Sequence, residues 1–162
     1  MTEIFQLATE LGRALTTRGW TAATAESCTG GLVASAITDI AGSSGWFDRG
    51  FVTYSNEAKV ELLGVRAETL ARHGAVSEAT AREMVAGAFD RSRADIAVAV
   101  TGIAGPGGGT VEKPVGLVWL AWGVRGGPVE AISRQFPGDR AAVREASVAI
   151  ALGGLLDRTK PR

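Results

Sequence analysis

Cysteine, histidine and tyrosine each occur once in this chain of 162 residues, as Cys28, His73 and Tyr54. A single cysteine excludes an intramolecular disulfide and favours a reducing compartment. A zinc site needs several His, Cys or carboxylate ligands at close spacing, so we expect no metal site and no cofactor. A Ser–His–Asp triad would depend on His73, which precedes Gly74 at an expected helix end, where a cation stabilises the helix dipole.

An excess of charge of either sign is also absent. Lys and Arg together number 17, as do Asp and Glu, and the formal net charge is +0. Binding to DNA or RNA requires clustered Lys and Arg that neutralise phosphates, so we expect no nucleic-acid partner. No apolar run reaches the ~20 residues of a membrane helix, and residues 1–4 lack the basic start of a signal peptide. We therefore expect a cytoplasmic protein with no membrane partner.

Helical and strand-like patterns alternate along the chain. With 162 residues, 46% of them hydrophobic, the chain can bury a core without disulfides, and we expect one domain over residues 1–162. Apolar spacing predicts helices at 3–18, 31–40, 56–63, 67–72, 78–91 and 139–156. Strands are predicted at 21–25, 50–54, 96–100, 115–122 and 129–136, the last two as an antiparallel hairpin. This alternation indicates the α/β class: a layered α/β/α domain with a mixed central sheet flanked by helices.

Ser27 stands between an expected strand and the pair Gly30-Gly31, which precedes an expected helix. A helix N-terminus presents free N–H groups and partial positive charge, which suits a phosphate or the oxyanion of a tetrahedral intermediate. Capping of that helix by Ser27 or Thr29 is the alternative interpretation. We interpret the neighbouring Cys28 as a buried, inert thiol, because free cysteine is among the most buried residue types.

Lys59 falls in an expected helix, shortly after Tyr54. A lysine can serve as a base when burial or a neighbouring cation lowers its pKa. Taken singly, Lys59 would be a solvated surface group and Tyr54 a core aromatic residue with a polar tip. They matter as a set with Ser27, because Ser, Lys and Tyr can perform hydrolysis without histidine and the chain offers few other bases.

Many of the 22 glycines lie in loops, and the loop at 101–109 is especially rich in them. Such loops at strand ends let the backbone approach a phosphate, so we expect this one to contact a ligand. It lacks the Gly-Lys-Ser/Thr ending of a Walker motif and leads to a strand, which disfavours ATP hydrolysis. Trp119 and Trp122 are expected in the core or at a subunit interface.

Two longer segments are distinctive: residues 25–31 read Ala-Glu-Ser-Cys-Thr-Gly-Gly, and residues 49–59 read Arg-Gly-Phe-Val-Thr-Tyr-Ser-Asn-Glu-Ala-Lys. Three shorter ones lie at 39–44, 73–77 and 101–106. Together, and in this order, they resemble the CinA C-terminal domain family, over about residues 5–157. Stand-alone members of that family are nicotinamide-nucleotide amidases, and the sequence shows no second CinA domain.

The resemblance implies hydrolysis of the carboxamide of nicotinamide mononucleotide, which yields nicotinate mononucleotide and ammonia. It implies Ser27 as the nucleophile and Lys59 and Tyr54 as the pair that moves protons, and it leaves open which of them deprotonates Ser27. From the residues we expect the helix start at Thr29, Gly30 and Gly31 to stabilise the oxyanion. The candidates for holding the substrate phosphate are Ser43, Ser44, Arg49, and Thr101, Gly102 and Gly105 of the glycine-rich loop.

Other functions stay open at this point. A non-catalytic module that binds and senses pyridine nucleotides would need the glycine loops but not Tyr54 and Lys59. A hydrolase of another amide or of a nucleotide pyrophosphate is a second alternative, although pyrophosphate cleavage usually needs a metal held by clustered carboxylates. A purely structural domain is disfavoured by the glycine-rich loops. The apolar strands and the two nearby tryptophans favour a homo-oligomer, and we expect a homodimer.

Overall fold

Five strands form one mixed sheet in the order β2-β1-β3-β4-β5. The computed structural model describes residues 2–161. Its strands are β1 (Ala22–Glu26), β2 (Phe47–Val52), β3 (Ile96–Gly102), β4 (Leu117–Val124) and β5 (Val129–Gln135). Its helices are α1 (Glu3–Arg18), α2 (Leu32–Thr38), α3 (Asn56–Leu63), α4 (Ala67–His73), α5 (Glu78–Asp90) and α6 (Arg140–Arg158), with a 3-10 turn, η1 (Ser43–Gly45). Strands β2, β1 and β3 are parallel, and β4 and β5 continue the sheet antiparallel.

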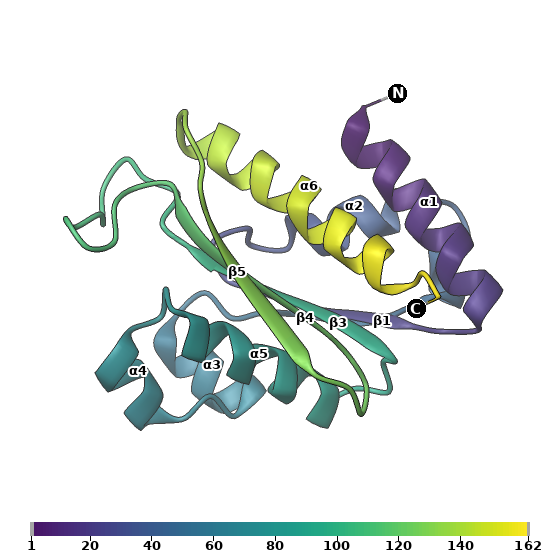
Figure 1. Cartoon of the computed structure of the whole chain (residues 1–162), viewed down its shortest axis with the longest axis horizontal. Coiled ribbons are helices and arrows are strands. Elements are labelled where there is room, and N and C mark those ends of the chain that lie inside the picture. Colours follow the sequence, from purple (N-terminus) through teal and green to yellow (C-terminus); the bar gives the residue numbers. More distant parts are fainter. Residues whose placement is uncertain (1, 162) are drawn as a thin grey trace.

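Helices cover both faces of this sheet (Figure 1). One face packs against α1, α2 and α6, and the other against α3 and α5, with α4 beside α5. The predicted layered α/β fold with a mixed sheet is therefore confirmed. None of the helices within residues 2–161 is long and apolar enough to cross a membrane.

Strand β3 shows how one sequence serves two helical layers. Ile96, Val98 and Val100 face the layer of α1, α2 and α6, whereas Ala97 and Ala99 face α5. The small side chains on the second face allow α5 to lie close to the sheet. Trp122 of β4 lies, as expected, in the core, between the sheet and the layer of α1, α2 and α6. Its ring packs against α6, where Nε1 donates to the carbonyl of Ala151 (3.0 Å).

The second parallel strand is placed differently from its prediction. It was expected at 50–54 and spans Phe47–Val52, because its pairing with β1 begins at Phe47 opposite Ala22. Pairing then ends at Thr53, whose N–H donates to the carbonyl of Glu26 (2.8 Å).

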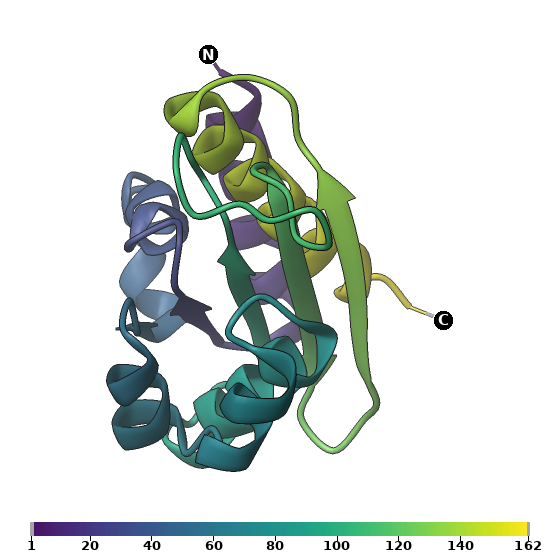
Figure 2. The same cartoon turned by 90° about the vertical axis from the view of Figure 1, so that its left-hand side faces the viewer.

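The ends of β1 and β3 point to the same edge of the sheet. The β3–β4 loop and the beginning of α6 lie together there (Figure 2), and Arg140 donates to the carbonyl of Gly105 across them (2.8 Å).

Candidate active site

The turn after β1 presents Ser27 at this edge. The N–H of Ser27 donates to the carbonyl of Val100 in β3 (2.9 Å), and the N–H of Gly30 donates to the carbonyl of Ser27 (3.0 Å). Gly30 and Gly31 have φ angles of 57° and 102°, which glycine adopts without strain, so the chain can reverse here before α2 begins. Ser27 is only 8% exposed.

Glu26, the last residue of β1, fills the start of α2. Its carboxylate is fully buried and accepts hydrogen bonds from Thr29 Oγ1 (2.6 Å) and from the N–H groups of Val33 (2.9 Å) and Ala34 (3.0 Å). The N-cap of α2 is Gly31, so neither Ser27 nor Thr29 caps this helix. The anion that a helix N-terminus favours is therefore supplied by the chain itself.

Lys59 reaches Ser27 from α3. The hydroxyl of Ser55 caps that helix and accepts from the N–H of Ala58 (3.0 Å), which turns Lys59 into the interior, where it is 1% exposed. Its Nζ lies 3.0 Å from Ser27 Oγ and donates to the carbonyls of Thr53 (2.9 Å) and Tyr54 (3.4 Å). No ion pair within residues 2–161 includes Lys59.

Burial without a carboxylate partner lowers the pKa of Lys59 below the ordinary value of 10.5. A neutral amine has two N–H donors and one lone pair. The two carbonyls of Thr53 and Tyr54 can take the donors, and the hydroxyl of Ser27 can donate to the lone pair. The surroundings of Lys59 thus suit a base that is uncharged at rest.

A cavity of about 270 Å³ opens over this pair. Ser27, Lys59 and Tyr54 line it, together with the beginning of α6 and the β3–β4 loop. The predicted loop residues Thr101, Gly102 and Gly105 are also in its wall. Thr101 is fixed there by donating its hydroxyl hydrogen to the carbonyl of Ala75 (2.9 Å).

The other predicted binding residues lie outside this cavity. The hydroxyl of Thr29 donates to the carboxylate of Glu26. Gly30 and Gly31 form the turn that follows Ser27, and they are not among the described residues that line the cavity. Ser43 and Ser44 belong to η1. Arg49 lies on the edge strand β2, with Nε 2.9 Å from Asp48 Oδ2 and a second bond to the carbonyl of Arg91 (3.0 Å). The structure therefore does not bring Ser43, Ser44 or Arg49 to the Ser27–Lys59 pair.

Tyr54 stands at the mouth of the cavity and is 62% exposed. Its phenol oxygen accepts from Arg140 (3.0 Å). Among the hydrogen bonds within residues 2–161, none joins this phenol to Ser27 or Lys59; Lys59 binds only the backbone carbonyl of Tyr54. Arg140 is the first residue of α6 and was absent from the sequence-based candidates. A cation at a helix start opposes the helix dipole, and this unfavourable placement is the signal that could have identified it.

Cys28 follows Ser27 and also lines the cavity. Burial raises the pKa of its thiol to about 11, so the thiolate is scarce at neutral pH. This agrees with its interpretation as a buried, inert thiol. Arg144 of α6 holds the same turn by donating to the carbonyls of Cys28 (3.1 Å) and Thr29 (3.3 Å).

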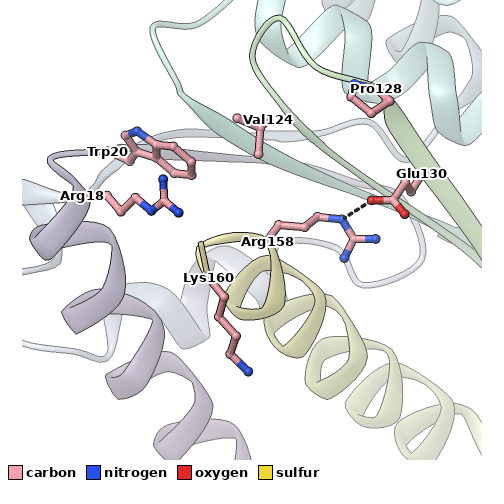
Figure 3. A pocket seen from close by; sticks show the side chains of 7 residues that line it. All are labelled: Arg18, Trp20, Val124, Pro128, Glu130, Arg158 and Lys160. Carbon is pink, nitrogen blue, oxygen red and sulfur yellow. Dashed lines mark ion pairs between the residues drawn. The ribbon is translucent and has the colours of Figure 1, made fainter. Parts of the chain in front are cut away.

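A second basic cavity, of about 290 Å³, lies near the end of α6 (Figure 3). Its cations already have partners. Arg158 pairs with Glu130 (3.4 Å), Lys160 pairs with Asp157 (3.4 Å), and Arg18 donates to the carbonyl of Thr159 (2.7 Å) and stacks on Trp20. Among the described residues, no hydroxyl or thiol side chain lines this cavity, so Ser27 marks the better candidate for a reaction site. Across residues 2–161, no three His, Cys, Asp or Glu side chains are grouped to hold a metal ion.

Nearly the whole chain is similar in sequence to known proteins. The model of the CinA C-terminal domain matches residues 4–159. A protein of Escherichia coli (strain K12) named nicotinamide-nucleotide amidohydrolase PncC is 60% identical over 152 residues, which cover 93% of this chain and 91% of the relative. A protein of the same name from Pseudomonas putida is 53% identical over 156 residues, covering 96% and 97%.

Solved structures show the same fold. The crystal structure of the competence/damage inducible protein CihA from Agrobacterium tumefaciens is 52% identical, with a TM-score of 0.97 over 99% of this chain and 98% of that one. A CinA superfamily protein from Klebsiella pneumoniae is 46% identical, with a TM-score of 0.92 over 96% and 97%. The similarity therefore extends over nearly the full length of these structures.

Proposed function

Because the chain belongs to the CinA C-terminal domain family, we propose that it is a hydrolase that converts nicotinamide mononucleotide and water to nicotinate mononucleotide and ammonia. The name shared by the curated relatives supports the reaction class. The observation that carries the proposal is the 3.0 Å contact between Lys59 Nζ and Ser27 Oγ at the wall of a cavity. An amide is a poor electrophile, so its hydrolysis needs an activated nucleophile of this kind.

Acylation begins with the neutral amine of Lys59. It accepts the Ser27 hydroxyl proton while Ser27 Oγ attacks the carboxamide carbon, and the carbonyl oxygen becomes an oxyanion. The ammonium of Lys59 then gives its proton to the amide nitrogen as the C–N bond breaks. Ammonia leaves, and the nicotinoyl group remains on Ser27 as an ester. Lys59 lies in contact with Ser27, so no intermediary is needed and we assign the role of base to Lys59.

The oxyanion needs a donor close to Ser27. The start of α2 is occupied by the carboxylate of Glu26, so it does not serve this purpose as first expected. Within residues 2–161, no backbone–backbone hydrogen bond uses the N–H of Cys28, and Cys28 lines the cavity. We assign the oxyanion to this N–H, since the residue after a nucleophile commonly supplies such a donor.

Deacylation repeats these steps with water in place of Ser27. Lys59 takes a proton from the water that attacks the ester carbon, and it returns a proton to Ser27 Oγ as the acid product leaves. Tyr54 forms the wall at the cavity mouth, where its phenol is held by Arg140. In this proposal Tyr54 contacts the substrate and does not relay the first proton.

Ammonia release from nicotinamide mononucleotide, measured with EDTA present, tests the proposal. Lys59→Met is expected to lower turnover about 10²- to 10⁴-fold, the usual contribution of a positioned proton acceptor. Ser27→Ala should lower it at least as much, because it removes the nucleophile. The matched controls are Ser133→Ala and Lys160→Met, which change residues outside the cavity and should keep wild-type turnover.

Three results would contradict the proposal or part of it. No release by the wild type would favour the non-catalytic module, which calorimetric titration with the same nucleotide would then test. Ammonia release that persists in Ser27→Ala would show that Ser27 is not the nucleophile. Full activity of Lys59→Met would show that Lys59 is not the base.

A further inference from the structure

We propose that Arg140, together with the backbone N–H groups of Gly107 and Gly108, binds the 5′-phosphate of the substrate and thereby selects nucleotides over nucleosides. The inference rests on the proposed function, because it concerns the same cavity. It replaces the expectation that Ser43, Ser44 and Arg49 hold the phosphate, since those residues lie outside that cavity.

Charge is the first argument. Among residues 2–161, Lys59 and Arg140 are the two cationic residues that line the cavity, and Lys59 is the buried base beside Ser27. No ion pair within the described part of the chain includes Arg140. A guanidinium carries five N–H donors, and Arg140 uses one bond to Gly105 and one to Tyr54. Donors therefore remain for a phosphate, which arginine binds through paired hydrogen bonds.

The placement of Arg140 is the second argument. Asp139 caps α6 by accepting from the N–H of Ala142 (2.9 Å), as a helix start favours, yet the next residue is a cation. An anion bound beside Arg140 would remove this conflict with the helix dipole. Arg140 also lines an adjoining hollow, with Gly138 and Arg144, so there is room around its guanidinium.

The third argument is the position of Arg140 relative to the reacting pair, Ser27 and Lys59. Tyr54 spans the cavity wall: its carbonyl accepts from Lys59 and its phenol accepts from Arg140. Lys59 and Arg140 thus contact opposite ends of Tyr54. In a nicotinamide nucleotide the carboxamide and the phosphate are likewise at opposite ends, with the pyridine ring and ribose between them.

The glycine-rich loop supplies further donors. Gly107 and Gly108 line the cavity, and none of the backbone hydrogen bonds formed within residues 2–161 uses their N–H groups. Successive free N–H groups in a turn form a concave anion site. A φ of 89° at Gly108 explains why glycine is needed there.

Two substrates that differ only in the phosphate test the inference. Turnover of nicotinamide mononucleotide and nicotinamide riboside would be measured for wild type, Arg140→Gln, Arg140→Lys and the control Arg134→Gln, an exposed arginine on β5. Arg140→Gln should lower kcat/KM for the nucleotide about 10- to 100-fold, mostly through KM, as expected for a lost charged hydrogen bond. Values for the riboside should stay within about twofold, and Arg140→Lys should recover part of the loss.

Binding of ribose 5-phosphate to Ser27→Ala gives an arm that needs no turnover. Adding Arg140→Gln to this variant should raise the Kd for ribose 5-phosphate by a similar factor, and adding Arg134→Gln should leave that Kd unchanged. Equal losses for nucleotide and riboside, or an unchanged Kd, would overturn the phosphate site. If wild type released no ammonia but Arg140→Gln still weakened ribose 5-phosphate binding, the hydrolase proposal would fail while the anion site stood.

Discussion

Lys59 is buried, and in the part of the chain that the structure describes it forms no ion pair with a carboxylate. Burial of an unpaired charge is costly. The protein meets this cost by favouring the neutral amine. The same carbonyls that satisfy its N–H donors also orient the lone pair toward Ser27. The same surroundings thus keep the amine of Lys59 unprotonated and aim it at Ser27, which links the burial of this residue of α3 to its reactivity.

The pH dependence of kcat/KM should follow from this burial. The ammonium form of Lys59 has no lone pair, so activity should be low at acidic pH and rise as Lys59 loses its proton. Because burial lowers the pKa of Lys59, the midpoint of the rise should lie below the ordinary lysine value of 10.5. Ammonia release measured across this range checks the prediction. A midpoint at or above 10.5, or a rate that is highest at acidic pH, would contradict it.

Glu26 should matter for stability as well as for the position of Ser27. Glu26→Ala would leave two buried donors, on Thr29 and Val33, and a partly buried one, on Ala34, without their acceptor. We expect the free energy of unfolding to fall by on the order of 3 kcal/mol, with a smaller loss for Glu26→Gln, which keeps one carbonyl oxygen. Urea denaturation measures both, against the exposed Glu61→Ala as a control. A loss no larger than that of the control would show that the carboxylate does not hold the start of α2.

Helix α6 contains two adjacent glycines with opposite surroundings. A Cβ at Gly154 would clash with the ring of Trp122, whereas a Cβ at Gly153 would meet no atom of residues 2–161 within 4 Å. Gly154→Ala should therefore destabilise the protein by about 1–3 kcal/mol through overpacking. Gly153→Ala should stabilise it by about 0.5–1 kcal/mol, because alanine favours the helix. Thermal unfolding of the two variants decides the matter, and stabilisation by both would mean that Trp122 can move aside.

Local patterns were sufficient to predict most elements of this chain. The strand predicted at 96–100 is β3, the central strand of the sheet. The helix predicted at 78–91 is α5, and Ser77 caps its start by accepting from the N–H of Thr80 (3.2 Å). Such features depend on neighbours in the sequence, so composition and spacing reveal them.

The strand order and half of the site depend on contacts between distant residues. Lys59 meets Ser27 across 32 positions. The scarcity of other bases and the resemblance to a family, not the spacing in the sequence, grouped these two residues. Arg140 meets Tyr54 across 86 positions, and no local pattern links them. The occupation of the α2 start by Glu26 was missed for a similar reason, because an acidic residue inside a strand reads as neither a cap nor a core residue.

The reactive groups gather at one edge of the sheet, where β1 and β3 end and α6 begins, as expected for ligands of sheets with parallel strands. This arrangement leaves the outer strands β2 and β5 available for assembly. Trp122 lies in the core, so it does not support the interface that the sequence suggested, although Val52 on β2 and Leu62 on α3 are exposed apolar residues.

We still expect a homodimer, and sedimentation equilibrium should give twice the 16.7 kDa of one chain. Val52→Asp is expected to lower the association constant if β2 is the contact, since a charge at a subunit contact would have to be desolvated. A mass of 16.7 kDa for the wild type at micromolar concentration would contradict the dimer.

Tyr54 gives this protein a built-in reporter of occupancy. It is the sole tyrosine of the chain, it is 62% exposed, and it stands at the mouth of the cavity. A reagent that nitrates phenols would therefore label one tyrosine ring per chain, and the absorbance of nitrotyrosine would report a single environment. Because its phenol lies against Arg140, a ligand that seats a phosphate there would shield the ring from labelling. The location of Tyr54 thus converts binding into an optical signal without any engineered probe.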